Sequence, residues 1–201
     1  MCIRDSRCSP VACATGSPAL SRTSDRASST RSAAAAGVQV DIQNAQGDKS
    51  AFQTIADGMI SSGVKVLMIV NLDSGTGSAV LKKAKDAGIA TIDYDRLTLK
   101  GGANYYVSFD NVAVGKLQGE GLVQCLTDKK VSKPVVAELN GSPTDNNATL
   151  FKQGYDSVLK PKYDSGEYLK GPDQSVPDWD NAQAGTIFEQ MLTQKLSLIH
   201  I

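Results

Sequence analysis

From residue 37 onward, short and largely apolar runs alternate with longer segments whose apolar positions recur every three to four residues. Such runs predict strands, and the longer spacing predicts amphipathic helices. The expected strands are VQVDIQNA (38–45), VKVLMIV (64–70), IATIDYD (89–95), YYVSFD (105–110) and VVAELN (135–140). The expected helices are KSAFQTIADGMISSG, SAVLKKAKDAG, NVAVGKLQGEGLVQCL, ATLFKQGYDSVL and WDNAQAGTIFEQMLTQ. This alternation predicts an α/β fold with parallel strands, in one sheet or in two.

Cap and turn residues bound the expected helices. Asp48 or Ser50 can cap the first helix, and Gly63 ends it. Lys160-Pro161 ends the helix that follows the loop GSPTDN, because proline cannot continue a helix. The stretch between that helix and the last one is rich in Gly and Pro, and no strand is predicted there.

Composition places the chain among ordinary folded proteins. Its 201 residues are 41% hydrophobic and 21% charged, which suits one domain or two small ones. The formal net charge is zero and no block of like charge occurs, so nothing indicates a nucleic-acid partner. No apolar run approaches the roughly 20 residues that a membrane helix needs.

The two ends of the chain, MCIRDS (1–6) and LSLIHI (196–201), read as translations of the two strands of one sequencing-library transposon end. We expect both to be adapter scars outside the fold, and the gene to be cut on both sides. Residues 7–36 carry four Arg and no Lys and show no sustained period. We expect this segment to be out of frame or disordered, and we place no chemistry on it.

If the scars and residues 7–36 are set aside, the remaining sequence lacks the residues for most kinds of catalytic site. The only histidine, His200, falls in the expected scar, which excludes His-based triads and the usual His-containing metal sites. No GxGxxG or GxxxxGKS/T motif follows an expected strand, so no nucleotide-binding loop is indicated. Cys125 is the one cysteine outside the suspect segments. We expect it to be a small core residue, or one whose disulfide partner is missing.

One arginine stands where a ligand is expected. Ligands of open parallel sheets bind beyond the carboxyl ends of the strands. Arg96 follows the expected strand 89–95 and is the only arginine of residues 37–195. Its guanidinium offers five donors in a rigid fork to acceptor oxygens. The alternative role is an ion pair with Asp93 or Asp95.

The stretch GSPTDNNA (141–148) follows the expected strand 135–140. Its Ser-Pro pair predicts a turn, and Asp145, Asn146 and Asn147 then stand at the start of a helix. One of these three side chains suffices to cap the helix. The other two are then available to form hydrogen bonds with neutral hydroxyl groups of a ligand. Asn146 is the expected capping or structural member, and capping alone remains the alternative reading.

The only tryptophan, Trp179, precedes the last expected helix. It predicts a core residue, a hydrophobic staple or a flat platform for the apolar face of a sugar ring. No nucleophile has a base beside it, and no carboxylate pair suited to glycosidase chemistry can be located. Binding is therefore favoured over catalysis.

Five motifs together resemble the periplasmic sugar-binding proteins of ABC importers, most closely the D-xylose-binding and multiple-sugar-binding members. They are IDYDRL (92–97), YYVSFDN (105–111), the GKLQGEGL helix, GSPTDNNATLF (141–151) and Trp179. The resemblance covers about residues 37–195. It implies the type I periplasmic-binding-protein fold, in which two Rossmann-like lobes with parallel sheets close on a sugar held between them.

The resemblance also implies a domain division and residue roles. Residues 37–109 would form an incomplete N-terminal lobe, and residues 110–195 an incomplete C-terminal lobe. Arg96 would donate to sugar hydroxyls, Asp145 would accept from them, Asn147 would do both, and Trp179 would stack on the ring. Neither a cofactor, a metal nor enzyme activity is implied. Apolar surface is expected to be exposed where strands of the lobes are missing.

The expected function is the substrate-binding component of an ABC-type sugar importer, with D-xylose as the first choice of sugar. The alternative is the effector-binding domain of a sugar-responsive repressor that has lost its DNA-binding region. A secretion signal or a helix-turn-helix upstream would separate the two. The expected partners are a monosaccharide and a membrane permease, with no nucleic acid, and the protein is expected to be a monomer. The expected location is the periplasm, or an extracytoplasmic lipid anchor.

Overall fold

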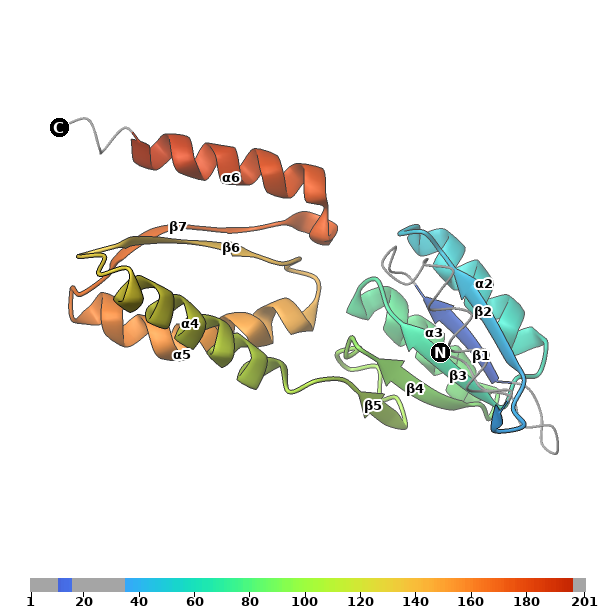
Figure 1. The fold of residues 1–201 in the computed structure, drawn as a ribbon. Helices are drawn as coiled ribbons and strands as arrows, with labels where there is room; N and C mark the ends of the chain where they lie inside the picture. The colour runs from blue at the N-terminus through green and yellow to red at the C-terminus, as the bar shows by residue number, and fades with distance from the viewer. Residues whose placement is uncertain (1–10, 16–34, 197–201) are drawn as a thin grey trace. The chain divides into compact units, whose positions relative to one another are not determined.

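The computed structural model describes residues 11–15 and 35–196. The chain divides into two compact units, Met1–Ser108 (unit 1) and Phe109–Ile201 (unit 2), each with its own parallel sheet (Figure 1). The division falls next to the 109/110 boundary that the resemblance implies. The α/β class with parallel strands is confirmed in both units.

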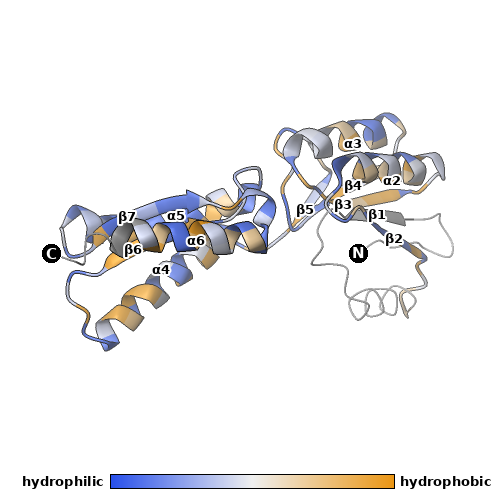
Figure 2. Ribbon diagram, turned by 90° about the horizontal axis from the view of Figure 1, so that it is seen from above, coloured by the Kyte–Doolittle hydropathy of each residue, from blue (hydrophilic) through white to orange (hydrophobic). Residues whose placement is uncertain are grey.

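Unit 1 holds a five-stranded sheet with the order β2-β1-β3-β4-β5. Its strands are β1 (Val11–Thr15), β2 (Val40–Asn44), β3 (Val66–Val70), β4 (Ala90–Tyr94) and β5 (Tyr105–Val107). Helices α2 (Lys49–Ser61) and α3 (Ser74–Asp86) cover one face of it (Figure 2). Asp48, not Ser50, caps α2: its side chain accepts from the Ala51 N–H at 2.8 Å.

The core of unit 1 forms because β3 is apolar on both faces. Leu67 and Ile69 point to the helices and are fully buried. The helical residues packed around them are Phe52, Ala56, Met59, Val80, Leu81 and Ala84. Met68 faces the other side of the sheet, where it packs with Val40, Val66 and Ile92. A strand buried on both faces is what the continuous apolar run at 64–70 predicts.

The central strand β1 lies where the sequence predicted no regular element. Residues 11–15 pair in parallel with β2 on one side and with β3 on the other. The run VACAT is too short for a period to be measurable, but its β-branched and small residues fit a strand held between two neighbours. The rest of the expected scars and out-of-frame segment, residues 1–10, 16–34 and 197–201, lies outside the described residues.

Unit 2 is built around a two-stranded parallel sheet of β6 (Val135–Asn140) and β7 (Leu169–Ser175). Helices α4 (Asn111–Asp128) and α5 (Asn146–Asp164) lie on one side of it, and α6 (Asn181–Leu196) on the other (Figure 1). A 3-10 turn, η2 (Pro177–Trp179), joins β7 to α6. Among the described strands β6 pairs with β7 alone, and the apolar side chains of Val135 and Leu139 on β6 are exposed.

Two boundaries in unit 2 differ from the prediction. β7 contains Gly171 and Pro172, which argued against a strand, but the register with β6 shifts at these two residues, and proline is tolerated at such an irregularity. Helix α5 continues through Pro161 to Asp164 instead of ending at Lys160. Proline there forfeits a single hydrogen bond, near the end of the helix, and the last turn closes through Ser165 N–H donating to Pro161 O at 3.1 Å.

Helices α4 and α5 touch backbone to backbone through glycines. A Cβ placed on Gly115 would collide with the Phe151 backbone, and one on Gly154 would collide with the Val112 carbonyl. Backbone atoms cannot turn aside as a flexible side chain can. The two helices therefore depend on glycine at these positions.

We expect Gly115→Ala to lower the free energy of unfolding by about 1–3 kcal/mol, the usual cost of overpacking a close contact. Gly121 lies on the same helix with open space around it. Gly121→Ala should therefore stabilise by up to about 1 kcal/mol through helix propensity. Urea unfolding of both variants, followed by circular dichroism, measures the difference. Equal effects of the two substitutions would contradict the close helix contact.

Candidate functional site

The start of α5 and the turn η2 meet through Asp145. The Asp145 side chain is buried, with one oxygen accepting from the Asn147 N–H at 2.9 Å and the other from Trp179 Nε1 at 3.0 Å. Asp145 is the N-cap of α5, since it has extended backbone angles directly before the first helical residue. Asn146 is the first residue of the helix, so the capping part of its expected role is wrong. Asp145 thus both starts α5 and holds the tryptophan.

Trp179 is a half-exposed ring lying against Gly141. Its side chain is held at Nε1, and a Cβ on Gly141 would overlap the six-membered part of the indole ring. The residue is 39% exposed, so the ring is not a core residue. Asp178 and Trp179 both have left-handed backbones, with φ of 51° and 57°. Two adjacent non-glycine residues in this region are uncommon, and such strain gathers at functional sites.

Asn147 is buried near Asp145 and Trp179, and it accepts a hydrogen bond from Asn111, a residue that was not predicted to belong to the site. Its Oδ1 accepts from Asn111 Nδ2 at 2.9 Å, and Asn111 is the first residue of α4. Asn111 is the last residue of the motif YYVSFDN (105–111), which spans the expected boundary between the two lobes at residues 109 and 110. The structure gives its last residue a second role, because the amide fixes how Asn147 is turned.

Arg96 lies in unit 1, in the turn after β4. Its Nη1 donates to Asn71 O at 3.4 Å, and Asn71 Nδ2 donates back to Arg96 O at 3.3 Å and to Thr98 Oγ1 at 2.6 Å. The preceding Asp95 has a left-handed backbone, φ 64°, and its carbonyl accepts from Ser108 Oγ at 2.8 Å. Asparagine and serine side chains therefore hold the turn that presents Arg96.

Asp93, one of the two ion-pair partners weighed for Arg96, serves the same turn. Its carboxylate is fully buried and accepts from the Thr98 N–H at 2.7 Å and from Thr98 Oγ1 at 2.8 Å. Burial raises the pKa of Asp93, and the two hydrogen bonds from Thr98 only partly oppose it. Asp93 is thus anchored to Thr98 and shapes the turn from beneath.

The sequence-predicted residues fall into two groups. Asp145, Asn147 and Trp179 come together in unit 2, joined by hydrogen bonds, while Arg96 stands in unit 1. Cys125 is exposed on α4, not buried as expected, because the helix turns its glycine-containing face to α5. Among the residues that the structure describes, no group of three acidic, His or Cys side chains could hold a metal, and no helix is long and apolar enough to cross a membrane.

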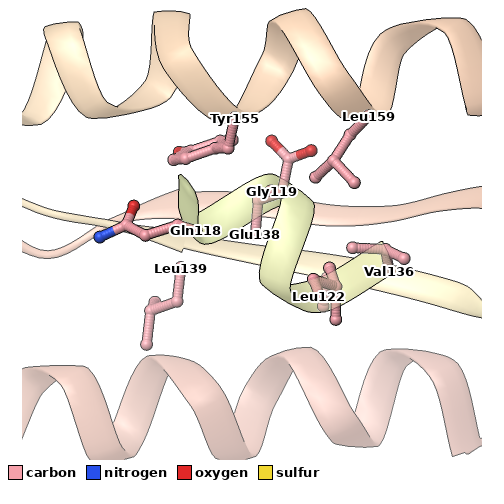
Figure 3. A pocket seen from close by; sticks show the side chains of 9 residues that line it. Gln118, Gly119, Leu122, Val136, Glu138, Leu139, Tyr155 and Leu159 are labelled. Atoms are coloured by element: carbon pink, nitrogen blue, oxygen red, sulfur yellow. The ribbon is translucent and has the colours of Figure 1, made fainter. Parts of the chain in front are cut away.

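A cavity of about 160 Å³ lies elsewhere in unit 2, between β6 and the helices α4 and α5 (Figure 3). Its lining is largely apolar and includes Leu122, Val136 and Leu159, with the Glu138 carboxylate pointing toward α5. It contains none of the predicted site residues. Leu139, the next residue of β6, points to the opposite side, toward α6 (Figure 3). The cavity follows β6 and is separate from the loop that carries Asp145.

Beneath that loop, a charged network ties β6, β7 and α5 together. Buried Glu138 accepts from Lys152 Nζ at 2.6 Å and from the Tyr163 hydroxyl at 2.9 Å. Lys152 also pairs with Asp173 at 3.0 Å, and Asn140 Nδ2 donates to Asp173 at 2.7 Å. Burial opposes ionisation of Asp173, but the hydrogen bonds from Lys152, Lys170 and Asn140 outweigh it and lower its pKa to about 2.

Comparison with known proteins gives this arrangement a family. A model described as a periplasmic binding protein domain matches residues 22–201. The D-xylose-binding periplasmic protein of Escherichia coli strain K12 is 37% identical over 169 residues, 84% of this chain and 50% of that protein. The multiple sugar-binding periplasmic receptor ChvE of Rhizobium radiobacter is 39% identical over 175 residues, 83% of this chain and 49% of that protein. The chain spans about half the length of these relatives.

Solved structures share the fold. An ABC transporter solute binding protein from Clostridium phytofermentans, with bound β-D-glucose, matches with a TM-score of 0.81 at 31% identity, over 90% of this chain and 59% of that one. A carbohydrate transporter solute binding protein from Chloroflexus aurantiacus, in complex with D-glucose, gives 0.75 at 27% identity, over 91% and 60%. The type I periplasmic-binding-protein fold is thereby confirmed for the described part of the chain. The family model and the two curated relatives together show that the chain belongs to the periplasmic binding protein domain family.

Proposed function

We propose that the chain is part of the substrate-binding component of an ABC-type sugar importer and that it binds a monosaccharide. The observation that carries this proposal is the half-exposed ring of Trp179, held in place by buried Asp145 next to Asn147. A fixed aromatic face suits the C–H side of a sugar ring, and a carboxylate and an amide beside it suit its hydroxyls. The sequence predicts no nucleophile with a base beside it, so we propose binding without turnover.

The proposed sugar is D-xylose. One relative at 37% identity is named for that sugar, while another at 39% is named for several sugars and two solved relatives hold glucose. We propose that Asp145 accepts from sugar hydroxyls, that Asn147 exchanges hydrogen bonds with them, and that Trp179 stacks on the ring. Arg96 is proposed to donate to the same sugar from the N-terminal lobe.

The proposed partner is the membrane permease of the importer, and no nucleic acid takes part. The two curated relatives are named as periplasmic, which supports a periplasmic or lipid-anchored extracytoplasmic location. We propose that the protein is a monomer. Unit 2 supplies the tryptophan platform, and the proposed contribution of unit 1 is Arg96.

Calorimetric titration of the full-length protein with a panel of aldopentoses and aldohexoses tests the proposal. We expect D-xylose to bind with a dissociation constant of micromolar or lower, and each sugar to be recovered unchanged. Binding heat with D-glucose but not with D-xylose would show that the proposed sugar is wrong, while the proposed sugar-binding function would stand. The absence of heat with every sugar would overturn the function.

A further inference from the structure

The hydroxyl of Ser142 lies between the loop that begins α5 and the turn that carries Trp179. Ser142 is buried, at 2% exposure. Its Oγ accepts from the Asp178 N–H at 3.2 Å and from the Thr144 N–H at 3.4 Å. A third neighbour, Thr144 Oγ1, lies 3.0 Å away. The hydroxyl thus joins two segments that are 36 residues apart in the chain.

The direction of these bonds follows from the valence of a hydroxyl group. A serine hydroxyl has one proton and two lone pairs. Because two backbone N–H groups donate to it, its own proton must be directed to Thr144 Oγ1. The bonding capacity of the group is then used within the protein, so Ser142 is suited to holding other residues and not to gripping a ligand itself.

The bond from Asp178 is made at the strained point of the turn. Asp178 and Trp179 both have left-handed backbones, which non-glycine residues rarely adopt unless neighbours hold them there. The Asp178 N–H is held by Ser142, the Trp179 side chain by Asp145, and the ring rests on Gly141, the residue directly before Ser142. Three residues of one loop, Gly141, Ser142 and Asp145, therefore fix the position of a single indole ring.

We propose that Ser142 is a positioning residue for Trp179. It holds the strained turn at Asp178 so that the indole stays against Gly141 with its outer part exposed. The consequence for sugar binding rests on the proposed function, but the placement of the ring does not. Removing the hydroxyl releases the Asp178 N–H and lets the turn relax, which tilts the ring away from the position in which Asp145 holds it.

The test uses the fluorescence of the chain, because Trp179 is its only tryptophan. We expect Ser142→Ala to shift the emission maximum and to raise the rate of acrylamide quenching without sugar present. In the full-length protein we expect affinity for D-xylose, or for D-glucose, to fall about tenfold. Ser142→Cys keeps the shape of the side chain, with a slightly larger atom that bonds more weakly, and should change both readouts in the same direction by less.

Ser157→Ala is the matched control. It also removes one hydroxyl from unit 2, but that hydroxyl donates to Gly154 O within α5 at 2.6 Å. Its tryptophan emission and its affinity should equal those of the unsubstituted protein. If Ser142→Ala and Ser142→Cys both leave the emission and quenching of Trp179 unchanged, the positioning role is overturned. If the emission shifts while no sugar binds even the unsubstituted protein, the role of Ser142 stands and the proposed function fails.

Discussion

Trp179→Ala in the full-length protein is expected to weaken monosaccharide binding at least tenfold, or about 1.4 kcal/mol. The substitution removes the ring that rests on Gly141, and it leaves the buried Asp145 carboxylate without the donor that meets it at 3.0 Å. A carboxylate without this partner can turn away from the proposed sugar. Trp179→Phe separates the two effects, because it restores an aromatic face without the Nε1 donor. Calorimetry with D-xylose measures both variants.

Arg96→Ala is expected to weaken binding by a similar factor, since a guanidinium donates to several acceptor oxygens at once.

Phe188 is an aromatic residue on α6, 46% exposed and outside the loops that carry the site. Phe188→Ala is therefore the control and should leave affinity unchanged. Unaltered affinity in Trp179→Ala or in Arg96→Ala would remove that residue from the site.

The second large effect is expected on stability. Lys152→Met should lower the free energy of unfolding by about 3 kcal/mol, since removing the nearer partner of a buried ion pair leaves Glu138 with only the Tyr163 hydroxyl and the more distant Lys170, at 3.9 Å. Glu138 is only 4% exposed in its side chain, and Lys152 bridges it to Asp173. Chemical unfolding, followed by circular dichroism at constant pH, measures the loss.

Lys160→Met is the matched control on the same helix. Lys160 pairs with Asp164 at 2.7 Å, but both side chains are well exposed, so about 0–1 kcal/mol is expected. Adding Glu138→Gln to Lys152→Met should recover part of the loss, because the buried charge that lost its nearer partner is then gone. Equal losses in Lys152→Met and Lys160→Met would show that the network around Glu138 does not stabilise unit 2.

The sequence pattern predicted those helices and strands whose own apolar residues show which face is buried. The run 64–70 is apolar throughout and became β3, and the spacing of Phe52, Ala56 and Met59 became the buried face of α2. It could not predict β1 or β7. Residues 11–15 depend on neighbours on both sides, and β7 accommodates Pro172 where its register with β6 shifts. Such pairing is decided by residues far away in the chain.

The candidate site was predictable in its residue types but not in its contacts. The position of Asp145 and Asn147 after a strand indicated a ligand-facing edge, and the single Trp179 indicated a platform. The bonds that join them, from Trp179 Nε1 to Asp145 and from Asp178 to Ser142, close across more than thirty residues. No local pattern encodes such bonds. The role of Arg96 in binding stays a prediction.

The glycine contact between α4 and α5 has a mechanical consequence. Where Gly115 and Gly154 bring the two backbones together, no side chain can change rotamer to absorb a displacement. We therefore expect the two helices to move as one rigid body. Asn147 lies in the first turn of α5, and α4 begins two residues after Phe109, where unit 2 joins unit 1 at Ser108. A displacement of the first turn of α5 would therefore be transmitted through α4 to the segment that connects the two units.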